Sequence, residues 1–116
     1  MAVEFDGTND YINCGSAASI DNIFASGGSV AFWVFIDILP DTSYDGYVCK
    51  IPDASTPGWR ILYNDGDAGY VDTLNFGHTF DGDDGQWRAP SSSLATISKW
   101  FHIAVTYDKS ATTNDP

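Results

Sequence analysis

Residues 99–108 read Lys99-Trp100-Phe101-His102-Ile103-Ala104-Val105-Thr106-Tyr107-Asp108. Side chains of a β-strand alternate between two faces. One face of a strand here would carry Phe101, Ile103, Val105 and Tyr107, and the other Trp100, His102, Ala104 and Thr106. A second stretch, Ser29 to Asp37, alternates in the same way and is apolar on both faces. We therefore predict a central strand at 29–37 that is covered on both sides.

The rest of the chain consists of shorter strand-like runs separated by turn signals. Further strands are predicted at residues 2–5, 11–14, 47–51, 59–63, 73–80, 86–89 and 100–107. Five Asp-Gly pairs punctuate the chain, and each is a candidate for a tight turn. Strands that recur about every ten to fifteen residues, with turns between them, are typical of an antiparallel β-sandwich.

Composition agrees with one all-β domain. The 116 residues are enough for a single domain with a core, and aromatic residues, which favour strands, make up 15%. Of the 16 acidic residues only Glu4 is glutamate. Because aspartate favours turns and glutamate favours helices, the acidity is expected to lie mainly in loops.

The net charge of -11 restricts the partners. Binding to nucleic acid or to an anionic membrane surface needs clustered Lys or Arg, and the chain has five such residues in all. No apolar stretch is long enough to span a membrane, and no signal peptide is predicted at the N-terminus. Cys14 and Cys49 each follow strand-like residues and are expected to be small buried thiols, with an oxidised pair in a secreted protein as the alternative.

A third informative stretch reads Phe5-Asp6-Gly7-Thr8-Asn9-Asp10-Tyr11-Ile12. Together with residues 30–34 and 99–108, it resembles the laminin-G-like, concanavalin-A-like jelly-roll domains. The resemblance implies an antiparallel β-sandwich of the kind found in secreted and surface proteins, where it binds glycans or other proteins. This fold also hosts glycosidases and purely structural modules, so the fold alone does not identify the ligand.

The resemblance covers nearly all of residues 1–116, read as a single domain, but only the earlier part of the domains it resembles. In those domains, closing strands follow the segment that matches residues 100–108. Three alternatives stay open: the closing strands are missing, another chain supplies them, or this version is minimal. Open edges would favour self-association or strand donation from a partner.

Catalysis is not predicted. Glycosidases of this fold use paired carboxylates, usually Glu, that alternate on one strand, and this chain has a single Glu. No nucleophile elbow or reactive-cysteine motif is present either. His102 belongs to the structural signature of its strand in the domains it resembles, and we expect it to be buried or half-buried and satisfied by a backbone group.

Calcium is the one cofactor that the sequence suggests, because calcium prefers carboxylate and carbonyl oxygens. Three acidic turns are dense in such atoms, and the resemblance implies a calcium ion at the rim of the sandwich. The candidate ligands are Asp6, Asp10, Asp65, Asp67, Asp81, Asp83 and Asp84. None of the turns matches an EF-hand loop, and each is equally explained as a solvated Asp-Gly turn.

Glycan binding combines aromatic faces with planar polar groups. Two Trp-Arg pairs, Trp59-Arg60 and Trp87-Arg88, are candidates for this role. In a strand, the two members of each pair must point to opposite faces. Trp59 alternates with Ile61 and Tyr63 and is expected in the core, whereas Trp87 is the candidate for an exposed aromatic surface. The candidate ligand-binding residues are Trp87, Arg88, Arg60 and Tyr70.

We therefore predict a non-catalytic recognition module that binds a glycan or protein partner, with calcium as an optional aid, in an extracellular, cell-surface or virion-surface protein. The main alternative is a structural component of an assembly, such as a virion or tail part, that uses the sandwich for packing. A weaker alternative is a glycosidase fragment whose catalytic strand lies outside this chain.

Overall fold

Six β-strands form the regular structure of the described residues. The computed structural model describes residues 2–6, 8–15, 17, 20, 23–24, 26–39, 44–50, 58–64, 70–79, 84–94 and 96–108. The strands are β1 (Gly28–Ile36), β2 (Tyr44–Lys50), β3 (Gly58–Asn64), β4 (Thr73–Thr79), β5 (Asp84–Arg88) and β6 (Lys99–Tyr107). Each lies within a few residues of a predicted strand, because the alternation of side chains marks strands well.

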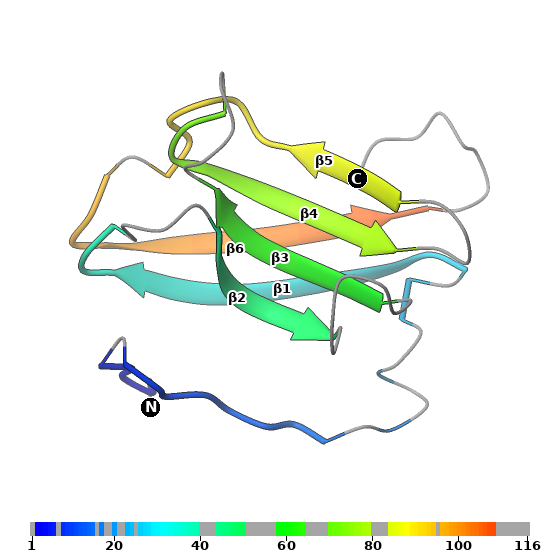
Figure 1. Ribbon diagram of the computed structural model, residues 1–116, viewed down its shortest axis with the longest axis horizontal. Helices are drawn as coiled ribbons and strands as arrows, with labels where there is room; N and C mark the ends of the chain where they lie inside the picture. The colour runs from blue at the N-terminus through cyan, green and yellow to red at the C-terminus, as the bar shows by residue number, and fades with distance from the viewer. Residues whose placement is uncertain are drawn as a thin grey trace.

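The strands form two antiparallel sheets that pack as a sandwich, and Figure 1 shows the two layers. β2, β3, β4 and β5 form a four-stranded sheet in sequence order. β1 and β6, which are far apart in the sequence, form a two-stranded sheet whose register runs without a shift from Gly28 opposite Tyr107 to Ile36 opposite Lys99. The predicted all-β antiparallel sandwich is therefore confirmed.

The core lies between the two sheets. Its main cluster consists of Phe24, Trp59, Ile61, Phe76, Ile103 and Val105. A second cluster consists of Ile36, Tyr63 and Leu94, and the Tyr63 hydroxyl donates a hydrogen bond to a carboxylate oxygen of Asp72. The prediction that Trp59 belongs to the core is confirmed, since only 4% of its surface is exposed.

The segment that follows β5, residues 89–94, is hydrogen-bonded to the beginning of β4. The Ala89 N–H donates to the Leu74 carbonyl at 3.0 Å, and the Leu94 N–H donates to the Asp72 carbonyl at 2.8 Å. The Thr73 hydroxyl donates to the Ala89 carbonyl at 2.8 Å. These bonds satisfy backbone groups that would otherwise be buried without partners, and they deliver Leu94 to the second core cluster.

The prediction that the strand at 29–37 is covered on both sides is wrong. Val30, Phe32 and Val34 on the inward face of β1 pack against the core. On the outward face, Trp33 is 65% exposed and Phe35 is 43% exposed. The four-stranded sheet packs against one face of β1 only, so the apolar residues of the other face remain at the surface.

The predicted hairpin of residues 2–5 and 11–14 is also wrong. Residues 2–6 and 8–15 are not in a strand, and Figure 1 shows this segment running apart from both sheets. The acidic turn does form: the Asp6 N–H donates to a carboxylate oxygen of Asp10 and the Thr8 N–H donates to one of Asp6, both at 2.8 Å. The Asp6 and Asp10 side chains therefore accept hydrogen bonds from backbone N–H groups that would otherwise be available to pair two strands of a hairpin.

Both cysteines are exposed free thiols, which corrects the prediction that they are buried. Cys14 lies in the unpaired N-terminal segment. Cys49 lies in β2 opposite Arg60 of β3, which places it on the outward face of the four-stranded sheet. Within the described residues, no helix is long and apolar enough to cross a membrane.

Candidate functional site

The outward face of the two-stranded sheet carries a group of exposed rings, which we call the aromatic face. Its residues are Ser29, Ala31, Trp33 and Phe35 of β1 and Trp100, His102, Ala104 and Thr106 of β6. Trp33 lies opposite His102, with ring centroids 5.0 Å apart, and Phe35 lies opposite Trp100, at 5.5 Å. Trp100 is 53% exposed. Four rings thus form two adjacent cross-strand pairs that are open to solvent.

The aromatic face continues beyond the strand ends, where Asp37 is exposed between Ile36 and Ile38. The Ser98 N–H donates to the Ile36 carbonyl at 2.6 Å and holds the two chain segments together there. Ile38 and Ile97 are both exposed next to this contact. Neither β1 nor β6 contains an acidic residue, although the chain carries a net charge of -11. At the other end, the hydroxyls of Ser29 and Thr106 lie 3.1 Å apart and supply polar groups.

The structure places His102 differently from the prediction. The side chain is exposed rather than buried, and its ring lies beside that of Trp33. The physical reason is the same as for Trp33: no further layer covers this side of the sheet within the described part of the chain. A histidine here can donate hydrogen bonds to a ligand that rests on the neighbouring ring.

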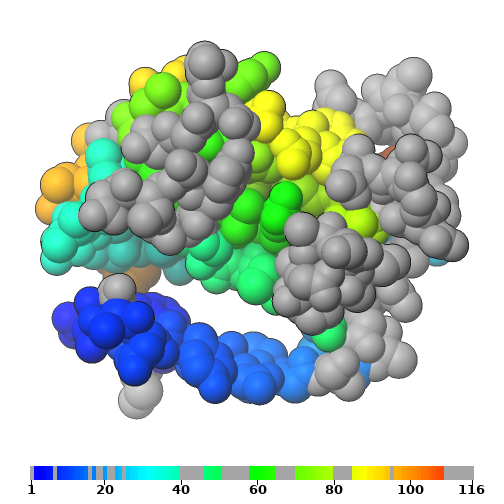
Figure 2. Space-filling view, viewed as in Figure 1, coloured from blue at the N-terminus to red at the C-terminus, as the bar shows by residue number. Residues whose placement is uncertain are grey.

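The outward face of the four-stranded sheet carries both arginines of the chain, and we call it the arginine face. Arg60 of β3 lies opposite Gly77 of β4, which in turn lies opposite Gln86 of β5. Arg88 donates from Nη2 to Oε1 of Gln86 at 2.8 Å, and its guanidinium lies 4.8 Å from the centroid of the Tyr70 ring. Figure 2 shows green and yellow atoms of this sheet reaching the surface.

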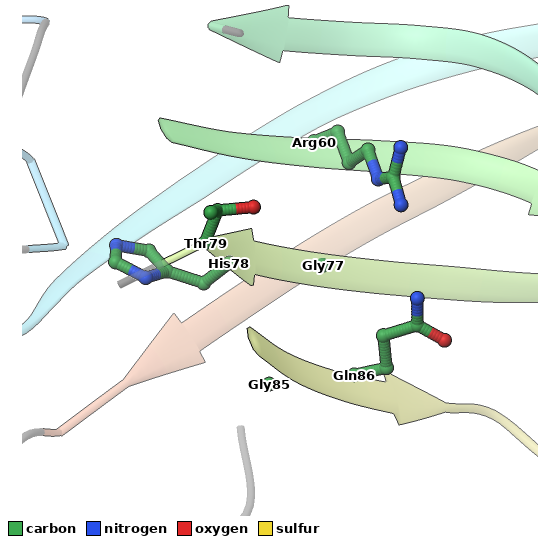
Figure 3. A pocket seen from close by; sticks show the side chains of 6 residues that line it. All are labelled: Arg60, Gly77, His78, Thr79, Gly85 and Gln86. Atoms are coloured by element: carbon green, nitrogen blue, oxygen red, sulfur yellow. The ribbon is translucent and has the colours of Figure 1, made fainter. Parts of the chain in front are cut away.

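A shallow hollow lies on the arginine face, and we call it the arginine hollow. It is lined by Arg60, Gly77, His78, Thr79, Gly85 and Gln86. Figure 3 shows the side chains of Arg60 and Gln86 on either side of Gly77. A Cβ on Gly77 would lie 3.1 Å from Nε of Arg60, so the hollow depends on the absence of that side chain.

Three of the four predicted ligand-binding residues are brought to one side of the sandwich, namely Arg60, Arg88 and Tyr70. The prediction that Trp87 forms an exposed aromatic surface is wrong. Its ring stacks on Phe76 at 5.5 Å and is packed against the main core cluster. Alternation required Trp87 and Arg88 to face opposite sides, and burial of the larger apolar ring decided which one faces inward.

Of the seven predicted calcium ligands, the structure describes the side chains of Asp6 and Asp10. Each accepts a hydrogen bond from a backbone N–H of its own turn, which fits the interpretation of this segment as an Asx-type turn. Asp65, Asp67, Asp81 and Asp83 lie outside the described residues, and Asp84 is described only as the first residue of β5. Among the described residues, no three acidic, histidine or cysteine side chains come together as a metal site.

Calcium binding therefore stays a prediction with a direct test. If the acidic turns hold a calcium ion in the folded state, the thermal midpoint will rise with millimolar calcium and fall back with EDTA, because a ligand of the native state stabilises it. Magnesium at the same concentration serves as the control for ionic strength. An unchanged midpoint would leave these turns as solvated Asp-Gly turns.

The comparison with protein families identifies the superfamily of the chain. The family model described as the concanavalin A-like lectin/glucanases superfamily, of the laminin G type, matches residues 6–114. The chain therefore belongs to this superfamily, as its three informative stretches indicate. Neither the comparison with curated proteins nor that with solved structures gave a match.

Membership of this superfamily indicates a class of function but does not identify a ligand. The superfamily includes both lectins and glucanases, and laminin G-like domains are generally non-catalytic. A binding module is therefore compatible with the family, and the ligand depends on the residues at the surface of this chain. Sequence reasoning missed the aromatic face, although the doubly apolar pattern of residues 29–37 was its signal.

Proposed function

We propose that this domain is a non-catalytic recognition module that binds a glycan on the aromatic face. One observation carries the proposal: Trp33, Phe35 and Trp100 are exposed together on one side of a two-stranded sheet. Large exposed apolar patches on soluble proteins mark binding sites. The rigidity of paired strands fixes these rings before any ligand arrives, which lowers the entropic cost of binding.

The chemistry of the aromatic face suits a sugar better than an aliphatic protein surface. Sugar rings present C–H groups that pack against aromatic faces, while their hydroxyls need hydrogen-bond partners. The aromatic face offers both kinds of group, because His102 lies beside Trp33 and the Ser29 and Thr106 hydroxyls lie further along the same sheet. An aliphatic partner would leave these polar groups without partners.

The test is binding to a panel of neutral oligosaccharides, measured by calorimetry or on an array, with Trp33→Ala and Trp100→Ala compared with the wild type. We expect each substitution to weaken binding at least about tenfold, since buried tryptophans dominate binding energy. The thermal midpoint should hardly change, because substitutions at exposed positions usually alter stability by only about 0.5 kcal/mol.

Tyr11→Ala is the matched control. Tyr11 is 81% exposed in the N-terminal segment, away from either sheet, so its removal deletes an exposed aromatic ring without touching the aromatic face. Glycan binding should survive this change. Equal loss with Tyr11→Ala and Trp33→Ala, or binding unaffected by Trp33→Ala, would contradict the proposed site.

A second candidate function is packing within an assembly, and the same sheet favours it. β1 and β6 each have one edge without a partner strand among the described residues. Unpaired strand edges beside an apolar face favour association with another chain or strand donation. A stable oligomer by light scattering that Trp33→Ala dissociates, together with no binding on the oligosaccharide panel, would replace glycan recognition by this function.

Two further expectations remain proposals. Because β1 and β6 contain no acidic residue, we expect a ligand to bind the aromatic face without calcium. A calcium ion at the acidic turns would then be bound elsewhere in the domain. A location outside the cell, or on a cell or virion surface, is inferred from the family alone.

A further inference from the structure

We propose that the arginine hollow is a second binding site, which takes the carboxylate group of an acidic sugar. The carboxylate would lie between the Arg60 guanidinium and the Gln86 amide. The sugar part of this proposal rests on the proposed function, whereas the carboxylate part rests on the geometry of the arginine face. The site lies on the sheet opposite the aromatic face, so one can be removed without touching the other.

The Arg60 guanidinium is the first element of the site. Arg60 is partly buried, yet its side chain makes no hydrogen bond or ion pair with another described residue. A charged group that loses part of its hydration needs a compensating partner. A planar carboxylate matches the fork of the guanidinium and accepts two parallel hydrogen bonds from it.

The Gln86 amide is the second element, and Arg88 sets its orientation. A guanidinium can only donate hydrogen bonds, so the contact with Arg88 requires Gln86 to turn its oxygen toward that residue. The amide nitrogen then points the other way, toward Gly77 and the Arg60 side of the hollow, as Figure 3 shows. Both walls of the hollow thus present N–H donors to the space between them.

The floor and lining of the hollow favour an acceptor as the ligand. Gly77 lies between Arg60 and Gln86 in the sheet register, and the Arg60 side chain lies over it, with Nε 3.1 Å from where a Cβ would be. None of the six lining residues is acidic, and Thr79 adds a hydroxyl. Arg60 has no side-chain partner among the described residues, and the nearest acidic position of the sheet is Asp84, opposite Thr79 in the register. A hollow lined by this guanidinium and by no acidic residue favours a negatively charged group over a cation.

The experiment compares trigalacturonic acid with its methyl ester, which has the same sugar rings but no negative charge. Binding to the intact chain is measured by calorimetry or NMR titration for the wild type and Arg60→Gln. We expect the acid to bind at least about tenfold more tightly than the ester, and Arg60→Gln to remove that difference, because hydrogen bonds between charged groups are the stronger kind.

Two variants make the result specific to the hollow. Lys99→Gln removes one positive charge from the other sheet and should leave the preference for the acid intact. Gly77→Ala keeps every charge but places a methyl group against Nε of Arg60, and it should reduce the preference. Circular dichroism spectra of all variants must match the wild type, so that lost binding is not lost folding.

Each outcome supports or overturns one part of the inference. Equal affinity for acid and ester, or a preference that Arg60→Gln leaves unchanged, would overturn the carboxylate site. Binding of tetraglutamate but not of trigalacturonate, with dependence on Arg60, would overturn the sugar assignment. Failure of the proposed function has a different signature, namely no binding of neutral oligosaccharides that depends on Trp33.

Discussion

Replacing Phe24 with alanine is expected to lower the free energy of unfolding by about 3 to 5 kcal/mol, the usual loss when a buried phenylalanine is truncated. Phe24 has no exposed surface and belongs to the main core cluster. A domain of this size is stabilised by only about 5 to 15 kcal/mol in total. The substitution therefore removes a large share of the stability of the fold.

The position of the Phe24 ring explains the size of the effect. Its centroid lies 5.2 Å from that of Trp59 in an edge-to-face arrangement and 5.0 Å from that of Phe76. Its ring also lies 6.4 Å from Tyr107 of β6. Phe24 therefore contacts β3 and β4 of one sheet and β6 of the other, and alanine would leave a cavity where the two sheets meet.

Thermal or denaturant unfolding followed by circular dichroism measures this loss. We expect the midpoint to fall by roughly 10 to 20 °C, given the entropy of unfolding of a domain of about this length. Phe5→Ala is the control, because Phe5 is 51% exposed in the N-terminal segment and its removal should cost little. Similar losses for Phe5→Ala and Phe24→Ala would show that the core is not built around Phe24.

The strands and the sandwich could be predicted from the sequence because both depend on local alternation. Val30 and Phe32, like Ile103 and Val105, lie two residues apart, and this period places them on one face of a strand. The structure packs these residues against or within the core as expected. The pairing of β1 with β6 is a long-range event that alternation does not specify.

The exposure of a face could not be predicted, because alternation says which residues share a face and not what lies against it. Residues 29–37 are apolar on both faces, which suits a strand between two layers and equally a strand with an exposed binding face. This pattern predicts Trp33 in the interior, and the family resemblance predicts a buried or half-buried His102, but both side chains lie at the surface. Phe24 shows the converse. The small and polar residues around it indicate a loop, yet its side chain is fully buried in the core.

The arginine face could be predicted in part. The sequence identifies Arg60 and Arg88 as candidate ligand-binding residues because each follows a tryptophan, and Tyr70 because it lies in or beside a loop. Gln86 and Gly77 were missed because their contribution depends on the register of three strands, which places them next to Arg60. No local pattern encodes that register.

Gly28→Ala should destabilise the fold by about 2 to 3 kcal/mol, which is typical when a side chain is forced into a packed site. A Cβ on Gly28 would lie 2.1 Å from the Ile23 carbonyl oxygen and 3.0 Å from the carbonyl carbon. Backbone atoms cannot move aside as the end of a flexible side chain can. Either the turn at 23–24 or the first residues of β1 would have to shift.

Gly46→Ala is the matched control for a glycine in a strand. The nearest atom to its Cβ would be Cδ2 of Leu62 at 3.6 Å, an ordinary contact. This change should be neutral or stabilise the fold by up to roughly 0.5 kcal/mol, because alanine loses less conformational freedom on folding. Equal effects of Gly28→Ala and Gly46→Ala would exclude close backbone approach as the cause.

The two core predictions are physically linked, and a double-mutant cycle tests the link. The chain at Ile23 can approach Gly28 so closely only because Gly28 lacks a side chain, and this approach brings Phe24 between the sheets. On this explanation, Gly28→Ala lowers the free energy of unfolding largely because it displaces Phe24 from the core. We then expect Gly28→Ala to cost at least about 1 kcal/mol less when Phe24 is already alanine, because coupled residues are not additive. Strict additivity, measured by denaturant unfolding of the four proteins, would mean that Gly28 and Phe24 stabilise the sandwich independently.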